Sequence, residues 1–443
     1  MLERFQHPGQ VVVTGFVVAI AIGTLLLWLP AATPGAGSAR LLDALFTATS
    51  AVCVTGLVTV DTANHWSRFG ELVILALIQV GGLGLMTLAT LFSVVLSRQF
   101  GLRARLAAQA ETKALQMADI RLFVRRVVLF TLTCEALVAA VLTGQFALGY
   151  GEPFARAVYL GIFHAVSAFN NAGFALWPDS LVRFAADPWI SLTICAAVIM
   201  GGLGFPVIFE LARSWRRPRS WSILTRVTVG TSAVLLAGGT LVLAVAEWTN
   251  PATLGALSGP SRVLAGFTAA VMPRTAGFNN LDIAAMRPES RLATDVLMFI
   301  GGGSAGTAGG IKVTTFALLG FVLWAELRGE SRVNIGHRRL PESTLRQTIA
   351  IVLLSIGVVT AATLTLLAIT DHALDLVLFE AVSAFATVGL STGITADLPP
   401  AAHLLLIALM FIGRIGPLTL GTALALRERT RRYELPEQHS IVG

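Results

Sequence analysis

Residues 379–390 read FEAVSAFATVGL, a short apolar stretch that begins with phenylalanine and reaches a glycine ten residues later. A helix needs about twenty apolar residues to cross a bilayer, and a run of about ten to fourteen is too short. Irregular backbone at membrane depth is tolerated only where protein buries it or where it lines a watery cavity. The stretch therefore predicts a re-entrant half-helix that ends in a turn inside the protein.

The same pattern occurs at three other places in the chain. These copies read FTATSAVCVTGL (46–57), FHAVSAFNNAGF (163–174) and FTAAVMPRTAGF (267–278). A cluster of small residues begins 24 to 28 residues beyond the glycine of each copy, at Gly81, Gly201, Gly301 and Gly413. One such turn arises by chance in many membrane proteins, but four in register are the signature of a repeat architecture. We expect four repeats, over residues 1–97, 98–212, 213–325 and 326–443.

The composition identifies an integral membrane protein. Of the 443 residues, 55% are hydrophobic and 13% are charged, whereas soluble chains carry about 25% charged residues. Eight apolar segments can be read along the chain, near 11–30, 70–97, 126–149, 188–212, 226–248, 292–325, 347–370 and 401–426. The predicted fold is all-α, with eight transmembrane helices and four re-entrant half-helices, in four span–pore-loop–span repeats about a pseudo-fourfold axis, as in potassium channels.

The positive charges sort by side of the membrane. The N-terminus, the alternate loops and the C-terminal tail carry 23 Lys and Arg residues, the opposite loops carry eight, and Arg414 lies within the last span. Because basic loops stay in the cytoplasm, we expect a multi-pass protein of the cell (inner) membrane with both termini cytoplasmic. The net charge of +7 then reflects topology and does not indicate nucleic-acid binding.

Four turns that meet on one axis would suit a cation pathway. Their carbonyl oxygens can replace the hydration shell of an ion, and the C-terminal ends of the half-helices are partially negative. Glycine is needed where the carbonyl must face the axis, because residues with a Cβ resist that conformation. The candidate cation-binding residues of this selectivity filter are Val54, Thr55, Gly56, Asn171, Ala172, Gly173, Thr275, Ala276, Gly277, Thr387, Val388 and Gly389.

The four turns differ from a potassium-channel filter in one respect. Such a filter reads TVGYG, whereas the position of its second glycine is occupied here by Val58, Ala175, Asn279 and Ser391. With one glycine in each quarter, fewer carbonyl rings are well ordered. We therefore expect weaker discrimination between potassium and sodium than a potassium channel shows.

A run of small residues, GGGSAGTAGG (301–310), interrupts the sixth apolar segment. A nucleotide-binding loop is one interpretation, but the spacing to Lys312 does not fit Walker A. Close helix packing through G-x-x-x-G pairs is a second. The third is a flexible break that lies under the filter and obstructs the cavity, since each glycine costs a helix about 1 kcal/mol. In that case Ser304 and Thr307 would satisfy freed backbone groups locally.

Five stretches resemble the Trk/Ktr/HKT superfamily of potassium transporters, and the eight spans resemble most the membrane subunits of the bacterial Ktr branch. They read SAVCVTGLVTVDT (50–62), SAFNNAGF (167–174), PRTAGFN (273–279), GGGSAGTAGGIKVTT (301–315) and ATVGLSTG (386–393). With glycine in all four filter positions, the resemblance implies a preference for potassium, with K⁺ bound at the filter residues. The resemblance implies a gate in the membrane, with Arg414 close to the run. The gate residues would be Gly301, Gly302, Gly303, Ser304, Ala305, Gly306, Thr307, Ala308, Gly309, Gly310, Lys312 and Arg414.

The same resemblance implies the partners. It implies a homodimer on a cytosolic ring of RCK-type (KtrA-like) subunits, which would bind ATP, ADP or NAD(H), while this chain itself binds no cofactor. The basic loops 98–126 and 213–226 and the arginine-rich C-terminus are candidate contacts with this ring, or with anionic membrane lipid.

Other classes of protein remain as alternatives. A sodium-permeable or sodium-coupled Trk-type transporter is one, and a polytopic membrane enzyme or a receptor is another. An enzyme is not favoured, because we find no nucleophile–base pair, metal-ligand spacing or phosphate loop. Two polar residues follow the opening phenylalanine of their repeats, His164 and Glu380. We expect them to cap or brace the re-entrant helices.

Overall fold

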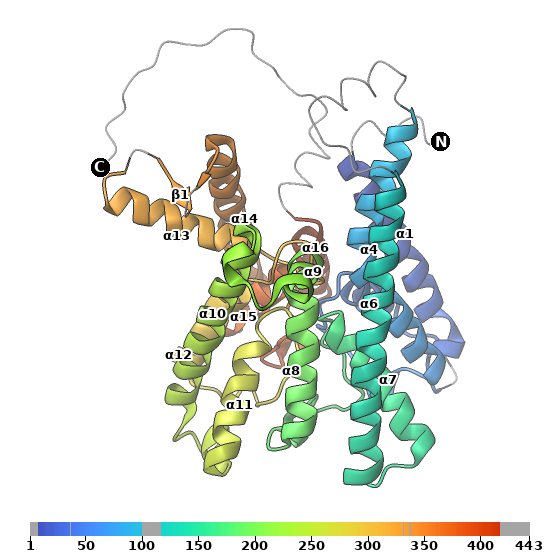
Figure 1. The fold of residues 1–443 in the computed structure, drawn as a ribbon. Coiled ribbons are helices and arrows are strands. Elements are labelled where there is room, and N and C mark those ends of the chain that lie inside the picture. Colours follow the sequence, from blue (N-terminus) through green and yellow to red (C-terminus); the bar gives the residue numbers. More distant parts are fainter. Residues whose placement is uncertain (1–7, 36, 100–116, 331, 336–337, 417–443) are drawn as a thin grey trace.

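The computed structural model describes residues 8–35, 37–99, 117–330, 332–335 and 338–416, and this part of the chain is almost entirely helical (Figure 1). The described strands, β1 (Asn334–Ile335) and β2 (Arg338–Arg339), form one small antiparallel hairpin in which Asn334 pairs with Arg339. Two regions singled out in the sequence, most of the basic loop 98–126 and the arginine-rich tail after residue 416, lie outside the described residues.

The helices follow the order of the predicted segments. In the first half of the chain they are α1 (Pro8–Trp28), α2 (Leu41–Val52), α3 (Thr62–His65), α4 (Arg68–Gln99), α6 (Met117–Gly144), α7 (Phe154–Phe169), α8 (Pro188–Leu203) and α9 (Phe205–Ser214). In the second half they are α10 (Ile223–Glu247), α11 (Gly259–Val271), α12 (Pro288–Phe299), α13 (Val313–Leu327), α14 (Glu342–Ile369), α15 (Leu374–Ala386) and α16 (Pro400–Ile415).

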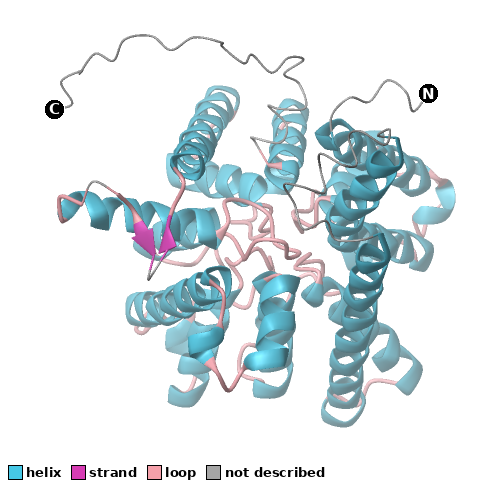
Figure 2. Cartoon of the chain, turned by 45° about the horizontal axis from the view of Figure 1, so that its top comes forward, coloured by secondary structure: helices cyan, strands magenta, loops and turns pink. Residues whose placement is uncertain are grey.

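Four short helices, α2, α7, α11 and α15, carry the repeated apolar stretches. Each packs against the long helix that precedes it in the chain, namely α1, α6, α10 and α14. Figure 2 shows the loops that follow them gathered at the centre, with helices around them. The phenylalanines that open three of the stretches, Phe46, Phe163 and Phe379, are fully buried. Their burial anchors the short helices inside the protein.

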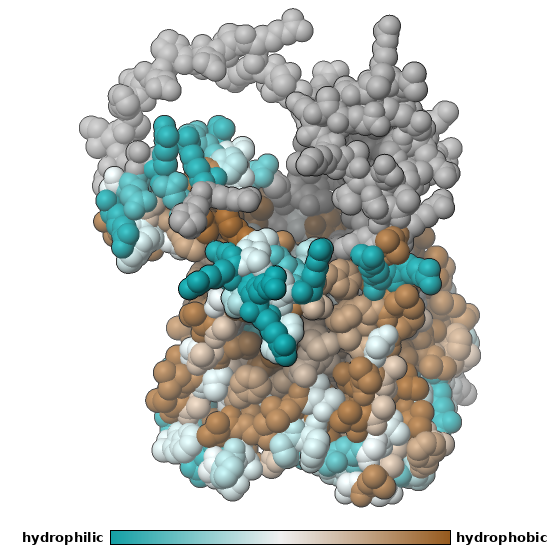
Figure 3. Space-filling view, in the orientation of Figure 1, coloured by the Kyte–Doolittle hydropathy of each residue, from teal (hydrophilic) through white to brown (hydrophobic). Residues whose placement is uncertain are grey.

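Several helices are suited to a membrane. Within the described residues, three helical segments are long and apolar enough to cross a bilayer, Val124–Gly149, Ile223–Glu247 and Glu342–Ile369, or four with one bent pair. Five further apolar helical segments of the described chain have only 10–17 residues. Figure 3 shows a largely apolar flank, and large apolar side chains of α10 such as Leu241 and Val245 are exposed. The chain is an integral membrane protein, and the count of eight spans stays a prediction.

The expectation of one continuous span over 188–212 is wrong. Helices α8 and α9 form a pair bent by 104°, and the bend lies at Gly204, which has φ +94°. A left-handed conformation is easy for glycine and ends the helix there. Gly416, the last described residue, has nearly the same φ (+90°) at the end of α16. These two glycines close the second and fourth small-residue clusters. By contrast, Gly84 of the first cluster lies inside continuous helix α4.

Candidate functional site

The turns that follow the four short helices share an unusual backbone. In the described part of the chain, six residues other than glycine have a positive φ, and four of them open these turns: Val54 (55°), Asn171 (59°), Thr275 (63°) and Thr387 (50°). The glycines two residues later also have positive φ values, 93°, 72°, 73° and 96°. A left-handed β-branched residue is a genuine outlier. Such strain costs about 1–3 kcal/mol per residue and persists only where the surroundings enforce it.

Hydrogen bonds to the preceding helix enforce the conformation. The N–H groups of Thr55, Ala172 and Val388 donate to main-chain carbonyls of Ser50, Ser167 and Ser383, at 2.8, 2.7 and 2.9 Å. The next N–H groups in the first and fourth turns, those of Gly56 and Gly389, donate to the Oγ atoms of Ser50 and Ser383. A trans peptide directs its carbonyl oxygen opposite to its N–H. The carbonyls of these turns therefore point away from the short helices.

The third turn reaches a similar backbone with different bonds. It has Val271 at the position of the serines, and the N–H groups of Ala276 and Gly277 both donate to the carbonyl of Met272, at 3.0 and 3.3 Å. Serine therefore supports the turn where it is present, and the main chain alone supports it in the third copy. The serine recurs four residues after the opening phenylalanine in three copies, a signal that the sequence carried and our prediction missed.

The four glycines lie against one another in cyclic order. A Cβ atom on Gly173 would lie 2.9 Å from the carbonyl oxygen of Ala276 and 2.9 Å from Cα of Gly277. A Cβ on Gly56 would meet Ala172 and Gly173 in the same way, and a Cβ on Gly277 would meet Val388 and Gly389. The circle closes because Gly389 faces Thr55 and Gly56. The carbonyl of each middle residue thus points at the neighbouring turn, and no side chain fits between.

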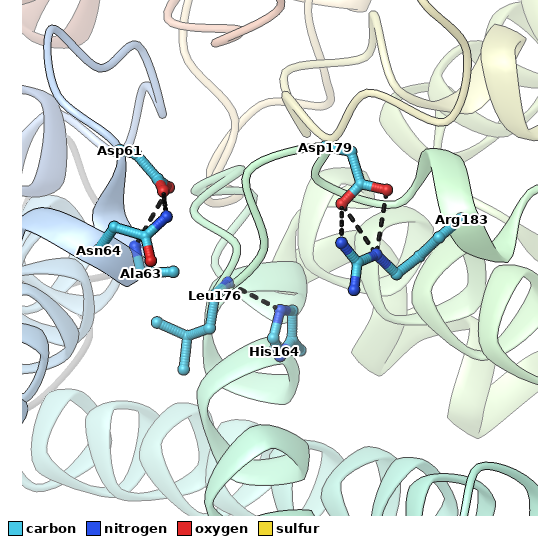
Figure 4. Close-up of polar contacts among 7 residues, drawn as sticks. All are labelled: Asp61, Ala63, Asn64, His164, Leu176, Asp179 and Arg183. Carbon is cyan, nitrogen blue, oxygen red and sulfur yellow. Dashed lines mark hydrogen bonds and ion pairs between the residues drawn. The ribbon is translucent and has the colours of Figure 1, made fainter.

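A cavity of about 280 Å³ opens on one side of this ring. The four glycines form its floor, and Asp61, Trp177, Ser391 and other residues of the loops after the turns line its wall. Figure 4 shows Asp61 and Asp179 on two of these loops. The Asp61 carboxylate caps α3 by accepting from Ala63 N–H at 3.2 Å, whereas Asp179 forms an ion pair with Arg183 at 2.6 Å. Asp61 therefore adds negative charge to the cavity wall.

The glycine run lies against the ring on the side opposite to the cavity. Helix α12 ends at Phe299 and α13 begins at Val313, on either side of the run. The two ends of the run lie together, because the N–H of Gly301 donates to the carbonyl of Ile311 at 2.8 Å. In between, Thr307 donates through its N–H to the carbonyl of Gly201 and through Oγ1 to Oδ1 of Asn171, at 3.2 and 3.1 Å. The run thus contacts the second turn directly.

The run also touches the fourth turn. A Cβ on Gly309 would collide with the side chain of Thr387, and one on Gly310 would lie 3.1 Å from Cα of Ala386. The expectation that Ser304 and Thr307 satisfy backbone groups within the run is wrong. Ser304 pairs with Thr314 at 2.8 Å, and Thr307 bonds to the second repeat. Tertiary contacts, and not local bonds, therefore hold this irregular backbone.

Two basic side chains, the buried Arg414 and the partly buried Lys312, hold the run. Arg414, which is 3% exposed, donates from Nη1 to the carbonyl of Thr307 and from Nη2 to the carbonyl of Gly81 at 2.8 Å. Lys312 donates from Nζ to the carbonyl of Ala308. Arg414 thereby joins the run to the first repeat through the last described helix. An arginine inside a membrane protein is costly unless it is paired, and here main-chain carbonyls accept from both of its Nη atoms.

The small-residue clusters pack on the short helices in the same register. A Cβ on Gly81, Gly201 or Gly413 would collide with the carbonyl oxygen of Val52, Phe169 or Phe385, respectively. Each of these carbonyls lies six residues after the opening phenylalanine of its repeat. Gly301 departs from the pattern and faces the carbonyl of Gly309 within the run. The third repeat has thus exchanged this helix contact for the folded-back run.

A buried ring of main-chain carbonyls, with a cavity on one side and a buried loop on the other, in a protein of apolar helices, defines a membrane transport protein. The chain belongs to the TrkH family, described as "Cation transport protein", which matches residues 2–431. This confirms the resemblance seen in the sequence.

The relatives cover nearly the whole chain. It is 40% identical over 428 residues to "Ktr system potassium uptake protein B" of Bacillus subtilis (strain 168), covering 96% of this chain and 95% of that protein. It is 32% identical over 443 residues to "Potassium/sodium uptake protein NtpJ" of Enterococcus hirae, covering 98% and 97%. The fold is similar to the crystal structure of the potassium transporter TrkH from Vibrio parahaemolyticus, with a TM-score of 0.74 at 18% identity over 96% of this chain and 86% of that one.

Proposed function

We propose that this chain takes up potassium ions across the cell membrane through a central pore. The observation that carries the proposal is the closed order of Gly56, Gly173, Gly277 and Gly389, each facing the middle carbonyl of the next turn. The relative from Bacillus subtilis, at 40% identity, bears the name of a potassium uptake protein. The ring indicates the part of the molecule that would conduct the ion, and the name of the relative indicates which ion it would be.

The four turns would form a selectivity filter on a pseudo-fourfold axis. An ion that enters from the cavity would exchange its water for main-chain carbonyl oxygens of the twelve turn residues, Val54–Gly56, 171–173, 275–277 and Thr387–Gly389. The pore would narrow most at the glycines, where no Cβ can be accommodated. Asp61 on the cavity wall would raise the local concentration of cations, because a carboxylate attracts them at the mouth of a pore.

The glycine run would be the gate of this pore. It lies against the first residues of the second and fourth turns, Asn171 and Thr387, so an ion that has passed the filter would meet it next. The N–H groups of Thr307 and Gly303 donate to the carbonyls of Gly201 and Gly202, at 3.2 and 2.7 Å. Opening would require the run to break these two hydrogen bonds. Arg414 and Lys312 would hold the closed position through the carbonyls of Thr307 and Ala308.

The pore would work within a larger assembly. We propose a homodimer with eight spans per chain, both termini in the cytoplasm, and a cytosolic RCK-type ring that binds the regulatory nucleotide. The support is the sequence resemblance to the Ktr branch and the name "Ktr system" of a relative. Nucleotide binding by the cytosolic RCK-type subunits would act on the glycine run, since this run is the irregular segment between α12 and α13.

Uptake by cells that lack their own potassium uptake systems tests the proposal. Cells that produce the full chain with a cytosolic RCK partner should grow at low potassium and take up potassium, and cells with the empty vector should not. Absence of uptake by a chain that reaches the membrane would overturn the proposal. Sodium uptake is the second candidate, because one relative is named a potassium/sodium uptake protein. Uptake in mixed potassium and sodium separates the two.

A further inference from the structure

Two fully buried polar residues, His164 and Glu380, stand at the same position of the second and fourth repeats, one residue after the opening phenylalanine. Both reach the loop that leaves the ring. The N–H of Thr392 donates to Oε1 of Glu380 at 2.8 Å, and the N–H of Leu176 donates to Nε2 of His164 at 3.2 Å (Figure 4). In both repeats the donor lies twelve residues after the acceptor, so the two bonds are equivalent.

Glu380 is the stronger of the two anchors. Besides the N–H of Thr392, its carboxylate accepts from the hydroxyls of Ser391 at 2.7 Å, Thr392 at 3.1 Å and Thr395 at 2.6 Å. All of these donors belong to the five residues that begin two positions beyond Gly389. A buried carboxylate is stable only when several donors satisfy it. The carboxylate and the loop therefore hold each other in one conformation.

His164 is fixed from its other nitrogen. Nδ1 lies 2.8 Å from the carbonyl of Leu160, and a carbonyl can only accept, so Nδ1 carries the proton. This leaves Nε2 as the acceptor for the N–H of Leu176. The ring also stacks on Trp177, with centroids 4.4 Å apart. The imidazole is thus held on one side by its own helix and on the other by the loop.

In the first and third repeats, the residue after the opening phenylalanine does not accept a hydrogen bond from the loop beyond the turn. Thr47 and Thr268 stand at the corresponding positions. Thr268 Oγ1 donates to the carbonyl of Leu264 in its own helix at 2.9 Å, and Thr47 Oγ1 has no hydrogen-bond partner within the described residues. In these repeats a loop side chain reaches back instead, as Thr59 does to Asp43 at 2.9 Å. The four quarters of the ring are therefore braced unequally.

The braced quarters face each other across the ring. Gly173 and Gly389 both neighbour Gly277, and the remaining glycine, Gly56, lies between them on the other side. We propose that Glu380 and His164 are positioning residues that hold this diagonal of the filter open, and that Glu380 sets its discrimination between potassium and sodium. The idea rests on the proposed function of the ring. Because Glu380 fixes residues 391–395, the fourth turn that leads into them cannot close its carbonyls onto the smaller sodium ion.

Ion discrimination of the full chain with its cytosolic partner, measured as the ratio of potassium to sodium uptake, tests this proposal. Glu380→Leu keeps the volume of the side chain but removes every acceptor. We expect the ratio to fall about tenfold, the change that corresponds to loss of one hydrogen bond to a charged group. Glu380→Gln retains a carboxamide oxygen for Thr392 and Ser391, and it should restore most of the ratio.

The chain offers a matched control at the same register. Thr47→Val in the first repeat removes a hydroxyl from a buried short helix but no bond to the loop, and its ratio should stay within about twofold of the unsubstituted chain. His164→Phe keeps a ring beside Trp177 and removes the acceptor for Leu176, so it should lower the ratio as Glu380→Leu does.

The outcomes separate the two proposals. If the unsubstituted chain takes up no potassium, the proposed function fails. If the unsubstituted chain is selective for potassium, and Glu380→Leu and His164→Phe have the same potassium-to-sodium ratio as the unsubstituted chain, the positioning role is overturned. A fall in total uptake at constant ratio would also overturn it, because that result indicates less folded protein. Should Glu380→Leu not reach the membrane, the ratio in His164→Phe decides alone.

Discussion

Nη2 of Arg414 donates to the carbonyl oxygen of Gly81 at 2.8 Å, although the two residues are 333 positions apart in the chain. The same guanidinium donates from Nη1 to the carbonyl of Thr307 in the glycine run. One side chain of the last described helix therefore ties the run to the first repeat. Because the run lies against the second and fourth turns, Arg414 links the first repeat to the segment that contacts these two turns.

Replacement of Arg414 by alanine should increase ion uptake. Each hydrogen bond from a charged donor contributes about 1.5–3 kcal/mol, and about 1.4 kcal/mol changes an equilibrium tenfold. Loss of the bonds to Thr307 and Gly81 should therefore raise potassium uptake in the absence of the cytosolic partner by about tenfold or more. Initial uptake rates, normalised to the amount of protein in the membrane, provide the measurement.

Arg262→Ala is the matched control for that experiment. Arg262 also donates to two main-chain carbonyls, those of Leu257 and Gly255, at 2.8 and 2.9 Å, but it lies at the start of α11, away from the run. Its replacement should leave uptake without the partner unchanged. Equal uptake by both variants would refute a gating role of Arg414.

Deletion of Gly303–Gly309 should open the pore. The deletion removes the segment that contacts Asn171 and Thr387 and shortens an irregular loop whose ends, Gly301 and Ile311, are already joined by a hydrogen bond. We expect potassium uptake above that of the intact chain, both with and without the partner. A deletion variant that folds, as judged by a single symmetric peak in size-exclusion chromatography, yet shows unchanged or lost uptake would contradict the gate.

Gly389→Ala should impair the filter. Gly389 has φ +96°, and a Cβ there would collide with the carbonyl of Thr55 and lie 3.0 Å from Cα of Gly56. The fourth turn must then move, and we expect potassium uptake at low external potassium to fall by about tenfold or more, since overpacking costs roughly 1–3 kcal/mol.

Gly151→Ala separates the collision at Gly389 from backbone strain. Gly151 also has a positive φ, +67°, but a Cβ there meets no atom within 4 Å, and it lies in the loop between α6 and α7, outside the lining of the cavity. Strain alone would affect both variants, whereas a role of the ring predicts that only Gly389→Ala loses uptake. A similar loss in Gly151→Ala would therefore count against the filter at Gly389.

Gly413→Ala should lower the thermal stability of the protein. Its Cβ would collide with the carbonyl oxygen of Phe385 in α15, and forcing the helices apart costs about 1–3 kcal/mol. Thermal unfolding of the purified full chain in detergent measures the effect as a lower melting temperature. In contrast, Gly357→Ala in α14 meets no atom within 4 Å, and a helical alanine is favoured over glycine by about 0.5–1 kcal/mol. Equal melting temperatures of the two variants would disprove the proposed packing role.

The positions of the turns could be predicted from the sequence because their causes are local. An apolar stretch too short to cross a bilayer, ended by a glycine, requires a turn inside the protein whatever surrounds it. For the same reason the break of the sixth apolar segment at 301–310 was visible as a run of poor helix formers, and α12 and α13 do flank it. The recurrence of the turn four times in register indicated a repeat architecture, which a single turn could not have done.

The bend at Gly204 was missed, although the sequence carries part of its cause. The first and second clusters both read GGLG, but Pro206 follows the second one and stands in the first turn of α9. Proline has no N–H with which to continue the preceding helix, so Gly84 lies in a continuous helix whereas Gly204 has φ +94°. The glycine run adds a tertiary contact, since Phe205 N–H donates to the carbonyl of Ala305 at 3.2 Å. The same four residues thus adopt two conformations because both the residues that follow them and their neighbours in space differ.

The sequence by itself determined that this is a membrane protein of four related units, where each unit turns back, and which family it resembles, because hydropathy, helix length and glycine conformation act within a few residues. Only the tertiary structure decided that the four glycines face one another in a closed order, that Val54, Thr275 and Thr387 adopt left-handed backbone, and that Arg414 reaches Gly81. These features depend on segments hundreds of residues apart, and packing against those segments supplies the energy that holds strained backbone and a buried charge in place.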